Sequence, residues 1–311
     1  MAISSRALSC SSQIRVVSSV VVAAASSSSV AVTADAAAAA TPPTTSLPPQ
    51  SVSVVLLCGG SGKRMGASIP KQYLELCGRP IVAWSLRLFA SMAEVKDVVV
   101  VCEPEYKKMI SEHWAEACER AKQRELNKSN PELKWALPGA ERQDSVQSGL
   151  AQIDSSSKLV AVHDSARPLT TAEDVRLCLS DAAGCGAAVL GVPVKPTIKE
   201  VNDDGTVART LVRARLWEVQ TPQVIEPELL RRGFAFAIER GLEVTDDVSV
   251  VELLGETVRI TQGSYTNIKA SFCFSWSWRE SWRERERGRA GKETKKRKQK
   301  LGDEESKQII F

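Results

Sequence analysis

The fold of this chain is decided by the stretch Val52-Ser53-Val54-Val55-Leu56-Leu57-Cys58-Gly59-Gly60-Ser61-Gly62-Lys63-Arg64-Met65. Its apolar first half predicts a buried β-strand over residues 52–57. The strand is followed by three glycines within four positions and then by basic residues, with Lys71 a few positions further on. Glycines let backbone N–H groups approach an anion closely, and the cations neutralise its charge. We therefore expect this loop to hold a nucleotide through its triphosphate.

The loop does not match either of two common phosphate-binding motifs. A Walker A motif would need glycine where Leu57 stands and a hydroxyl residue where Arg64 stands. A dinucleotide-binding fingerprint would need its third glycine where Met65 stands. These mismatches disfavour a P-loop kinase and a dehydrogenase, and they favour a loop that uses Arg and Lys as mobile charge. A plain strand-to-helix turn with solvated charge is the alternative.

Residues 1–50 have a composition unlike the rest of the chain. They are rich in Ser, Ala, Thr and Val and contain a single acidic residue, Asp35. This composition is typical of an organelle transit peptide, and its serine and alanine richness favours a plastid, so we expect a disordered leader and a location in the chloroplast stroma. A low-complexity disordered arm is the alternative. The apolar run over residues 20–25 is too short to cross a bilayer, so no membrane association is expected.

The other end of the chain, residues 271–311, is strongly basic. Within it, residues 279–300 carry eleven Lys or Arg against four Glu, a net charge of +7, whereas the whole chain carries +4. The rest of the chain is therefore mildly acidic. Charge runs of this kind are usually solvated and disordered. The sequence before the tail has no aromatic–basic interleaving and no zinc-ligand spacing, so no specific nucleic-acid partner is expected.

Residues 51–270 are enough for one α/β domain with a full core. The chain has eight cysteines, which never form Cys-x-x-Cys and mostly lie in apolar runs. We interpret them as small buried side chains in a reducing compartment, rather than as disulfides or metal ligands. The two histidines exclude a histidine-rich metal site and disfavour a Ser-His-Asp hydrolase.

Strand and helix patterns alternate along this body. Strands are predicted over residues 52–57, 95–101, 134–137, 159–162 and 187–192, and helices over residues 81–92, 106–120, 142–153 and 171–183. This alternation predicts a mostly parallel, doubly wound α/β sheet with ligands at the carboxyl ends of its strands. Residues of about 195–217 break the rhythm and predict a β-hairpin. We expect this hairpin to project as an arm that two copies exchange in a homodimer; a hairpin folded back on its own subunit is the alternative.

The strand over residues 159–162 leads into a second polar segment, His163-Asp164-Ser165-Ala166-Arg167. Asp164 could cap the next helix, but two threonines further along are better placed to do so. We therefore expect Asp164 to be a functional acid, close to a sugar hydroxyl or to a metal–phosphate complex. Arg167 is expected to fix this loop or a phosphate. His163 is equally consistent with a site residue and with a packed side chain.

Other polar residues are candidates for substrate contacts. Ser145 lies near a predicted helix start and could hydrogen-bond a base or ribose, with simple helix capping as the alternative. Thr197 and Arg213 bring a hydroxyl and a cation onto the hairpin, where they could meet a phosphate of a second substrate. Asn267-Ile268-Lys269 closes the recognisable body and places a lysine after a strand.

Six motifs occur in a fixed order: Gly-Gly-Ser-Gly-Lys-Arg-Met with Pro-Lys-Gln-Tyr-Leu, Glu-Arg-x-Asp-Ser-Val, His-Asp-Ser-Ala-Arg-Pro, Thr-Pro-Gln, Thr-Asp-Asp and Asn-Ile-Lys. In this series, from about residue 52 to 269, the chain resembles the 2-C-methyl-D-erythritol 4-phosphate cytidylyltransferase family in its plant plastid form. The resemblance implies a Rossmann-like nucleotidyltransferase domain and a homodimer interlocked through the hairpin arm. It also implies transfer of CMP from CTP to 2-C-methyl-D-erythritol 4-phosphate with release of pyrophosphate, a step of non-mevalonate isoprenoid synthesis.

The resemblance implies roles for individual residues. Arg64 and Lys71 match the catalytic pair that stabilises the charged transition state, an effect worth roughly 3–4 kcal/mol per group. The nucleotide-binding residues implied are Cys58, Gly59, Gly60, Ser61, Gly62, Ser145, Asp164 and Ser165. The substrate-binding residues implied are Arg167, Thr197, Arg213, Thr245 and Lys269. Mg²⁺ is implied as the cofactor, held mainly by the phosphates of CTP rather than by a protein ligand set.

The end of the body departs from the family pattern. The family continues after Asn-Ile-Lys with a helix that covers the sheet, whereas this sequence continues with Ala270-Ser271-Phe272-Cys273 and the basic tail. Loss of that helix would expose apolar surface, so an inactive isoform is one alternative. A cytidylyltransferase for another polyol phosphate, such as ribitol 5-phosphate, is a second, because Thr197, Arg213 and Lys269 decide the second substrate.

Overall fold

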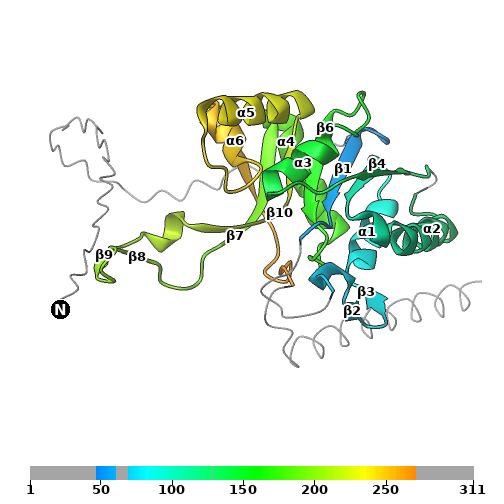
Figure 1. Ribbon diagram of the computed structural model, residues 1–311, viewed down its shortest axis with the longest axis horizontal. Helices are drawn as coiled ribbons and strands as arrows, with labels where there is room; N and C mark the ends of the chain where they lie inside the picture. The colour runs from blue at the N-terminus through cyan, green and yellow to red at the C-terminus, as the bar shows by residue number, and fades with distance from the viewer. Residues whose placement is uncertain (1–46, 61–68, 128, 271–311) are drawn as a thin grey trace, which may run out of the picture. The chain divides into compact units, whose positions relative to one another are not determined.

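The valine-rich run Val52–Leu57 forms β1, a strand in the middle of the sheet that is buried on both faces. Continuous apolar runs of this kind suit a parallel strand covered by helices on both sides. The computed structural model describes residues 47–60, 69–127 and 129–270 (Figure 1). The chain divides into two units, Met1–Pro42 and Pro43–Phe311, and all described residues belong to the second.

The described residues form a seven-stranded sheet in the order β11-β7-β10-β6-β1-β4-β5. Besides β1, its strands are β4 (Val95–Val101), β5 (Glu132–Ala136), β6 (Leu159–Asp164), β7 (Ala187–Pro193), β10 (Trp217–Ile225) and β11 (Arg259–Gln262). β10 runs antiparallel to its neighbours β6 and β7, whereas the other neighbouring pairs are parallel. The prediction of a mostly parallel sheet is therefore confirmed.

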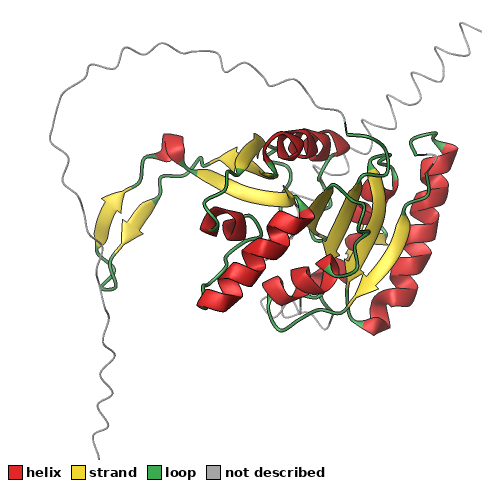
Figure 2. Cartoon of the chain, turned by 90° about the horizontal axis from the view of Figure 1, so that it is seen from above, coloured by secondary structure: helices red, strands yellow, loops and turns green. Residues whose placement is uncertain are grey.

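Helices cover both faces of the sheet, so the sheet is doubly wound as predicted (Figure 2). One face packs against α1 (Val82–Ala90), α2 (Lys107–Gln123) and α4 (Ala172–Cys185), and the other against α3 (Arg142–Leu150), α5 (Pro227–Arg240) and α6 (Ser249–Leu253). None of the described helices has the length and apolar character that a bilayer-spanning segment needs.

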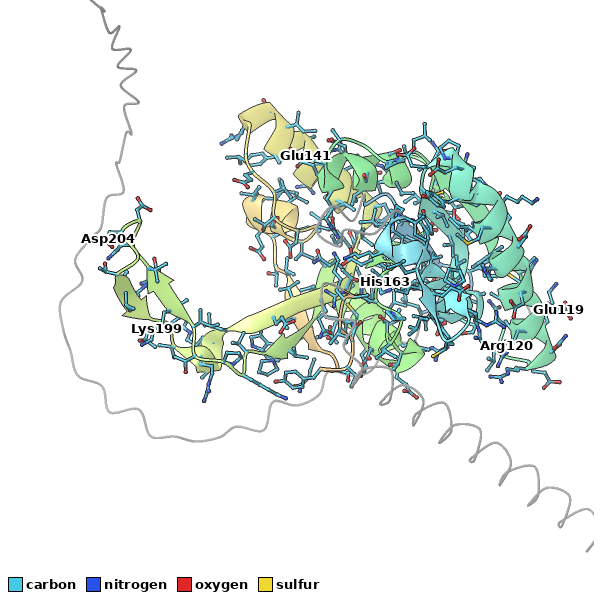
Figure 3. All side chains as sticks on the ribbon, turned by 60° about the horizontal axis from the view of Figure 1, so that its bottom comes forward. Glu119, Arg120, Glu141, His163, Lys199 and Asp204 are labelled. Carbon is cyan, nitrogen blue, oxygen red and sulfur yellow. The ribbon has the colours of Figure 1, made fainter. Side chains whose placement is uncertain are left out.

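The predicted hairpin is present. β8 (Lys199–Val201) and β9 (Val207–Thr210) pair antiparallel, and every residue of both strands is exposed. Figure 3 labels Lys199 and Asp204 on this hairpin and His163 within the main sheet. The chain returns to β10 through a short 3-10 turn, η4 (Arg213–Arg215). Exchange of the arm between two copies stays a prediction.

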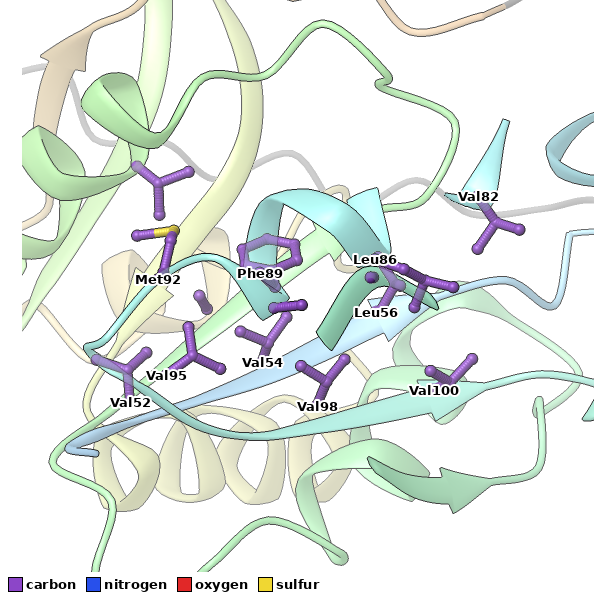
Figure 4. Packing of buried hydrophobic residues seen from close by; sticks show 14 of the residues in the cluster. Val52, Val54, Leu56, Val82, Leu86, Phe89, Met92, Val95, Val98 and Val100 are labelled. Atoms are coloured by element: carbon purple, nitrogen blue, oxygen red, sulfur yellow. The ribbon is translucent and has the colours of Figure 1, made fainter. Parts of the chain in front are cut away.

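The core beneath α1 follows from helical spacing. Leu86 and Phe89 lie three positions apart on one face of α1 and are fully buried. They pack in one cluster with Val54 and Leu56 of β1 and Val98 of β4 (Figure 4). Burying side chains of this size contributes about 1.5–3 kcal/mol each. This packing fixes α1 and the segment before it beside the carboxyl end of β1.

Several element ends differ from the predicted ones. β6 continues through Asp164 instead of ending at residue 162, and α3 ends at Leu150 instead of residue 153. β10 was not predicted, because polar residues such as Gln220 and Gln223 interrupt its apolar pattern. These two side chains are buried but hydrogen-bonded to neighbouring segments, which makes the strand compatible with the interior.

Replacing Gly149 with alanine is expected to destabilise the fold by about 1–3 kcal/mol. Gly149 faces the sheet from α3, and a Cβ there would lie 2.5 Å from Val55 Cγ1 and 3.0 Å from Val101 Cγ2. Gly184→Ala in α4 is the matched control, because a Cβ there meets nothing within 4 Å. Alanine is favoured over glycine inside a helix by roughly 0.5–1 kcal/mol. Urea unfolding should therefore show a lower free energy of unfolding for G149A and a higher one for G184A. A G149A variant with the unfolding free energy of the wild type would contradict the close packing.

Candidate active site

The strand order places the site. On one side of β1 the sheet continues through β4 and β5, and on the other it begins with β6. Such a reversal leaves a crevice outside the carboxyl ends of the strands, where α/β proteins bind ligands. In the register of β1 and β6, Leu57 pairs with Asp164. The glycine-rich loop that starts at Cys58 and the Asp164 carboxylate therefore emerge at the same edge.

Asp164 is surrounded by three cations. Its carboxylate lies 2.8 Å from Lys269 Nζ, 3.5 Å from Arg167 Nε and 4.0 Å from Arg142 Nη2. Burial alone would raise the pKa of Asp164, but Lys269 and the two arginines outweigh burial and lower the pKa to about 2. Asp164 is therefore ionised at neutral pH, and it balances a cluster of positive charge that would also suit an anionic ligand.

Asp164→Asn is expected to reduce the loss of unfolding free energy that the protein shows as pH falls below about 4. The pKa of Asp164 is about 2 in the fold, below the value of about 4 for an unfolded aspartate. Its ion pairs therefore contribute fully above pH 4, on the order of 2 kcal/mol, and the contribution is lost as pH falls through 2. Urea unfolding from pH 6 to pH 2 should show a smaller loss in D164N than in the wild type. Asp203→Asn, on the exposed hairpin turn, is the control, and equal slopes for D164N and the wild type would contradict the cluster.

Arg142 connects Asp164 to a second, buried carboxylate. Arg142 Nη1 donates to Asp247 Oδ1, and Asp247 is almost completely buried at the loop before α6. Burial raises the pKa of Asp247, with Arg142 opposing the rise. Gln223 Oε1 accepts from the backbone N–H groups of Asp247 and Val248 at 2.8 and 2.9 Å. The sequence did not predict a role for Arg142 or Asp247, although they lie in the motifs Glu-Arg-x-Asp-Ser-Val and Thr-Asp-Asp.

Asn267 holds the segment that carries Lys269. Its amide donates to Thr221 O at 3.0 Å, and its side-chain oxygen accepts from Thr170 Oγ1 at 2.8 Å. Arg167 Nη1 donates to Asn267 O at 2.7 Å, and Arg167 is itself nearly buried. Arg167 thus fixes the loop after β6, one of the two roles expected for it. Its contact with substrate stays a prediction.

His163 is a packed side chain. It is fully buried, and its ring makes an edge contact with Phe89 at a centroid distance of 5.2 Å. Burial lowers its pKa to about 3, so the ring is neutral at physiological pH. Thr221 Oγ1 accepts from the Asp164 N–H at 3.1 Å and lies 3.1 Å from His163 Nδ1. His163 therefore helps to fix the strand end through Thr221.

The beginning of the glycine-rich loop is closely packed. Cys58 is buried, and burial raises the pKa of its thiol, which therefore stays protonated at neutral pH. A Cβ on Gly59 would lie 2.4 Å from Pro138 Cβ, so only glycine fits there without movement. Ser165 Oγ donates to Leu57 O at 2.7 Å and ties the end of β6 to the end of β1.

Residues 52–273 match the family described as IspD: 2-C-methyl-D-erythritol 4-phosphate cytidylyltransferase. The chain belongs to this family. The protein named 2-C-methyl-D-erythritol 4-phosphate cytidylyltransferase, chloroplastic, of Oryza sativa subsp. japonica is 56% identical over 222 residues, 71% of each chain. The cytidylyltransferase of Desulforamulus reducens is 37% identical over 219 residues, 70% of this chain and 90% of that protein.

Solved structures of cytidylyltransferases share the fold. The Thermus thermophilus 2-C-methyl-D-erythritol 4-phosphate cytidylyltransferase is 28% identical, with a TM-score of 0.57 over 75% of this chain and 98% of that one. The Anaerococcus prevotii 4-diphosphocytidyl-2C-methyl-D-erythritol synthase, at 22% identity, has a TM-score of 0.61 over 73% of this chain and 94% of that one. The predicted Rossmann-like nucleotidyltransferase class is confirmed.

The remaining residues implied by the family pattern lie at several places. Ser145 Oγ accepts from Gly139 N–H at 3.0 Å and donates to Glu141 O at 3.1 Å, close to the start of α3. Thr245 is exposed before α6, and Thr197 and Arg213 are exposed on the arm, where Arg213 Nη1 donates to Lys195 O. Lys71 is half-buried at the start of the turn η2 (Lys71–Tyr73). Outside the described residues lie Ser61, Gly62 and Arg64, as well as residues 1–46 and the tail 271–311.

A magnesium ion carried by a nucleotide would suit the donor set of this site. In the part of the chain that the structure describes, no three His, Cys, Asp or Glu side chains are grouped to hold a metal. Asp164, the carboxylate at the strand ends, is already paired with Lys269. Mg²⁺ is usually bound through one or two carboxylates plus substrate phosphates rather than by an all-protein cage. Asp164 is the carboxylate that could contact such an ion, and Mg²⁺ held mainly by phosphates stays a prediction.

Proposed function

We propose that this chain transfers CMP from CTP to 2-C-methyl-D-erythritol 4-phosphate, giving 4-diphosphocytidyl-2-C-methyl-D-erythritol and pyrophosphate. The observation that carries the proposal is the register of β1 and β6, which brings the glycine-rich loop and the Asp164–Lys269 pair to one edge of the sheet. Membership of the cytidylyltransferase family supports the same chemistry.

The reaction needs positive charge around two phosphates. An oxygen of the 4-phosphate attacks the α-phosphorus of CTP, a new P–O bond forms, and the bond to pyrophosphate breaks. Arg64 and Lys71 would stabilise the charge on the oxygens of the α-phosphorus, and the backbone of Cys58, Gly59, Gly60, Ser61 and Gly62 would hold the triphosphate. Mg²⁺ would neutralise charge on the phosphate oxygens of CTP.

Asp164 would act as an electrostatic anchor rather than as a proton donor. Because its pKa is about 2, it holds no proton at neutral pH. Its contact with Lys269 keeps the ammonium group at the strand ends, where the 4-phosphate could take it up. Arg213, Thr197 and Thr245 would complete the second-substrate site, with Arg167 supporting it, and Ser145 and Ser165 would lie on the cytidine side.

The arm would join two copies of the chain. Val201, Val207 and Val212 are each more than half exposed on the arm, which is unfavourable for an isolated chain. Exchange of arms would cover these side chains and bring Arg213 to the partner's site. Sedimentation of the wild type at micromolar concentration should give a dimer, and a Val207→Glu variant should shift toward monomer. The leader and the rice relative's name together favour a plastid location.

The deciding experiment measures pyrophosphate release by the full chain with CTP and Mg²⁺. One reaction mixture contains 2-C-methyl-D-erythritol 4-phosphate, a second contains ribitol 5-phosphate instead, and a third contains methylerythritol phosphate without magnesium. Release with methylerythritol phosphate and magnesium alone is the expected result. Release only with ribitol 5-phosphate would mean that ribitol 5-phosphate, and not methylerythritol phosphate, is the second substrate. A folded, dimeric chain that is silent with both would favour an inactive isoform.

A further inference from the structure

The turn η2 holds the base of the glycine-rich loop from one side. Gln72 Nε2 donates to Cys58 O at 2.5 Å and to Gly60 O at 3.1 Å. Tyr73 Oη donates to the same Cys58 O at 3.0 Å. Gln72 is almost completely buried, and the bonds to Cys58 O are buried, whereas Gly60 is exposed. One carboxamide therefore uses both of its N–H groups on two carbonyls that flank Gly59.

These bonds set the direction of the peptide groups. A carbonyl oxygen accepts two hydrogen bonds, so Gln72 and Tyr73 together use the capacity of Cys58 O. Because the peptide bond is planar and trans, the N–H of Gly59 points to the side opposite the Cys58 carbonyl. With the Cys58 carbonyl turned toward η2, the Gly59 N–H is turned away from η2, in the direction an anion would need.

The turn itself is fixed from its other side. The Tyr73 ring stacks on Tyr106 at a centroid distance of 3.7 Å, and Tyr73 N–H donates to Pro70 O at 3.0 Å. Burial raises the pKa of the Tyr73 phenol, which keeps it a donor. Lys71 is the first residue of the same turn. Lys71, the proposed catalytic residue, therefore lies in the same turn as the two side chains that bond the loop, Gln72 and Tyr73.

We propose that Gln72 is a positioning residue for nucleotide binding, which orients the Cys58–Gly60 backbone toward the triphosphate and couples that backbone to Lys71. This inference rests on the proposed function. Methionine at position 72 would keep the length of the side chain but supply no donor, and glutamate would turn two acceptors toward two carbonyls. Misplacing reacting groups by about 1 Å can cost about 100-fold in rate.

The test compares CTP binding and steady-state kinetics in Gln72→Met, Gln72→Glu and Tyr73→Phe of the full chain. We expect Q72M to raise the Kd and KM for CTP by about 10- to 100-fold, with little change in KM for methylerythritol phosphate or in Tm. Q72E should be worse, and Y73F milder, because Cys58 O keeps one donor. Gln50→Met is the matched control. Gln50 lies just before β1, at the opposite edge of the sheet, and the change removes the 2.7 Å hydrogen bond from its side-chain amide to Val95 O.

Four results would overturn the inference. One is a Q72M that binds CTP like the wild type, and another is a Q72M in which Tm and both KM values change in parallel, as a general folding defect would cause. If Q72M does not fold, Y73F decides, and an unchanged Kd for CTP in Y73F overturns the inference. A wild type that binds no CTP overturns the proposed function as well, whereas a wild type that binds CTP beside an unaffected Q72M overturns this inference alone.

Discussion

Lys71→Met is expected to lower kcat by about 100- to 1,000-fold while leaving Tm close to that of the wild type. A preorganised cation beside the α-phosphorus is worth most in the transition state, where negative charge accumulates on the phosphoryl oxygens. Lys71 is well placed for this, because the turn that carries it is anchored to Cys58 and Gly60 by Gln72 and Tyr73. Pyrophosphate release under saturating CTP and methylerythritol phosphate measures kcat directly.

The control for this variant is Lys96→Met. Lys96 Nζ pairs with Asp154 at 2.9 Å, near the amino end of β4 and so at the opposite edge of the sheet. Its replacement removes the same charge and should leave kcat within a factor of two to three, since this half-buried pair lies at the opposite edge of the sheet. Lys71→Arg should recover part of the activity. A K71M enzyme with wild-type kcat would show that Lys71 takes no part in the chemical step.

The position of the site was accessible from the sequence because it depends on local signals. The apolar run over residues 52–57 defines a strand, and the glycines after it define a loop. Asp164 follows another apolar run, so its place at a strand end was also local information. Parallel strands bring their carboxyl ends together, which is enough to predict that Asp164 and the loop share an edge.

The partners of Asp164 could not be obtained in this way. Lys269 and Asp164 are 105 positions apart, and their contact depends on where the segment held by Asn267 crosses the strand ends. The Ser165 hydroxyl donates to the Leu57 carbonyl, a bond that the sequence did not predict, and its expected contact with nucleotide stays a prediction. A hydroxyl next to an aspartate looks the same in sequence whether it binds a ligand or ties two strands together.

Arg142 and Asp247 illustrate the same limit. Both lie in quoted motifs, Glu-Arg-x-Asp-Ser-Val and Thr-Asp-Asp, so the motifs carried a signal that their positions matter. Their pairing, however, depends on α3 and α6 lying on the same face of the sheet. Local patterns predict each helix separately and say nothing of which face it covers.

Arg142→Met is expected to destabilise the protein by about 3 kcal/mol at pH 7. Removing one partner of a buried ion pair typically costs 3–5 kcal/mol, because the other charge is left uncompensated. The lower end applies here, since the Arg142 side chain is 35% exposed, although Asp247 is only 2% exposed. Arg231→Met, which breaks an exposed pair with Glu228 on α5, is the control and should change stability by less than 1 kcal/mol.

Two further measurements separate the loss of the charge pair from a general packing defect. Adding Asp247→Asn to Arg142→Met should restore part of the lost stability, because the uncompensated charge is gone. The sign of the pH dependence should also follow from Asp247. Burial already raises its pKa, and without Arg142 the folded-state pKa would lie further above the unfolded value. The difference in unfolding free energy between the wild type and R142M should therefore shrink as pH falls through that raised pKa, because Asp247 then takes up a proton. A deficit that is constant from pH 7 to pH 4, with no recovery in the double variant, would mean that the cost of R142M comes from packing and not from charge.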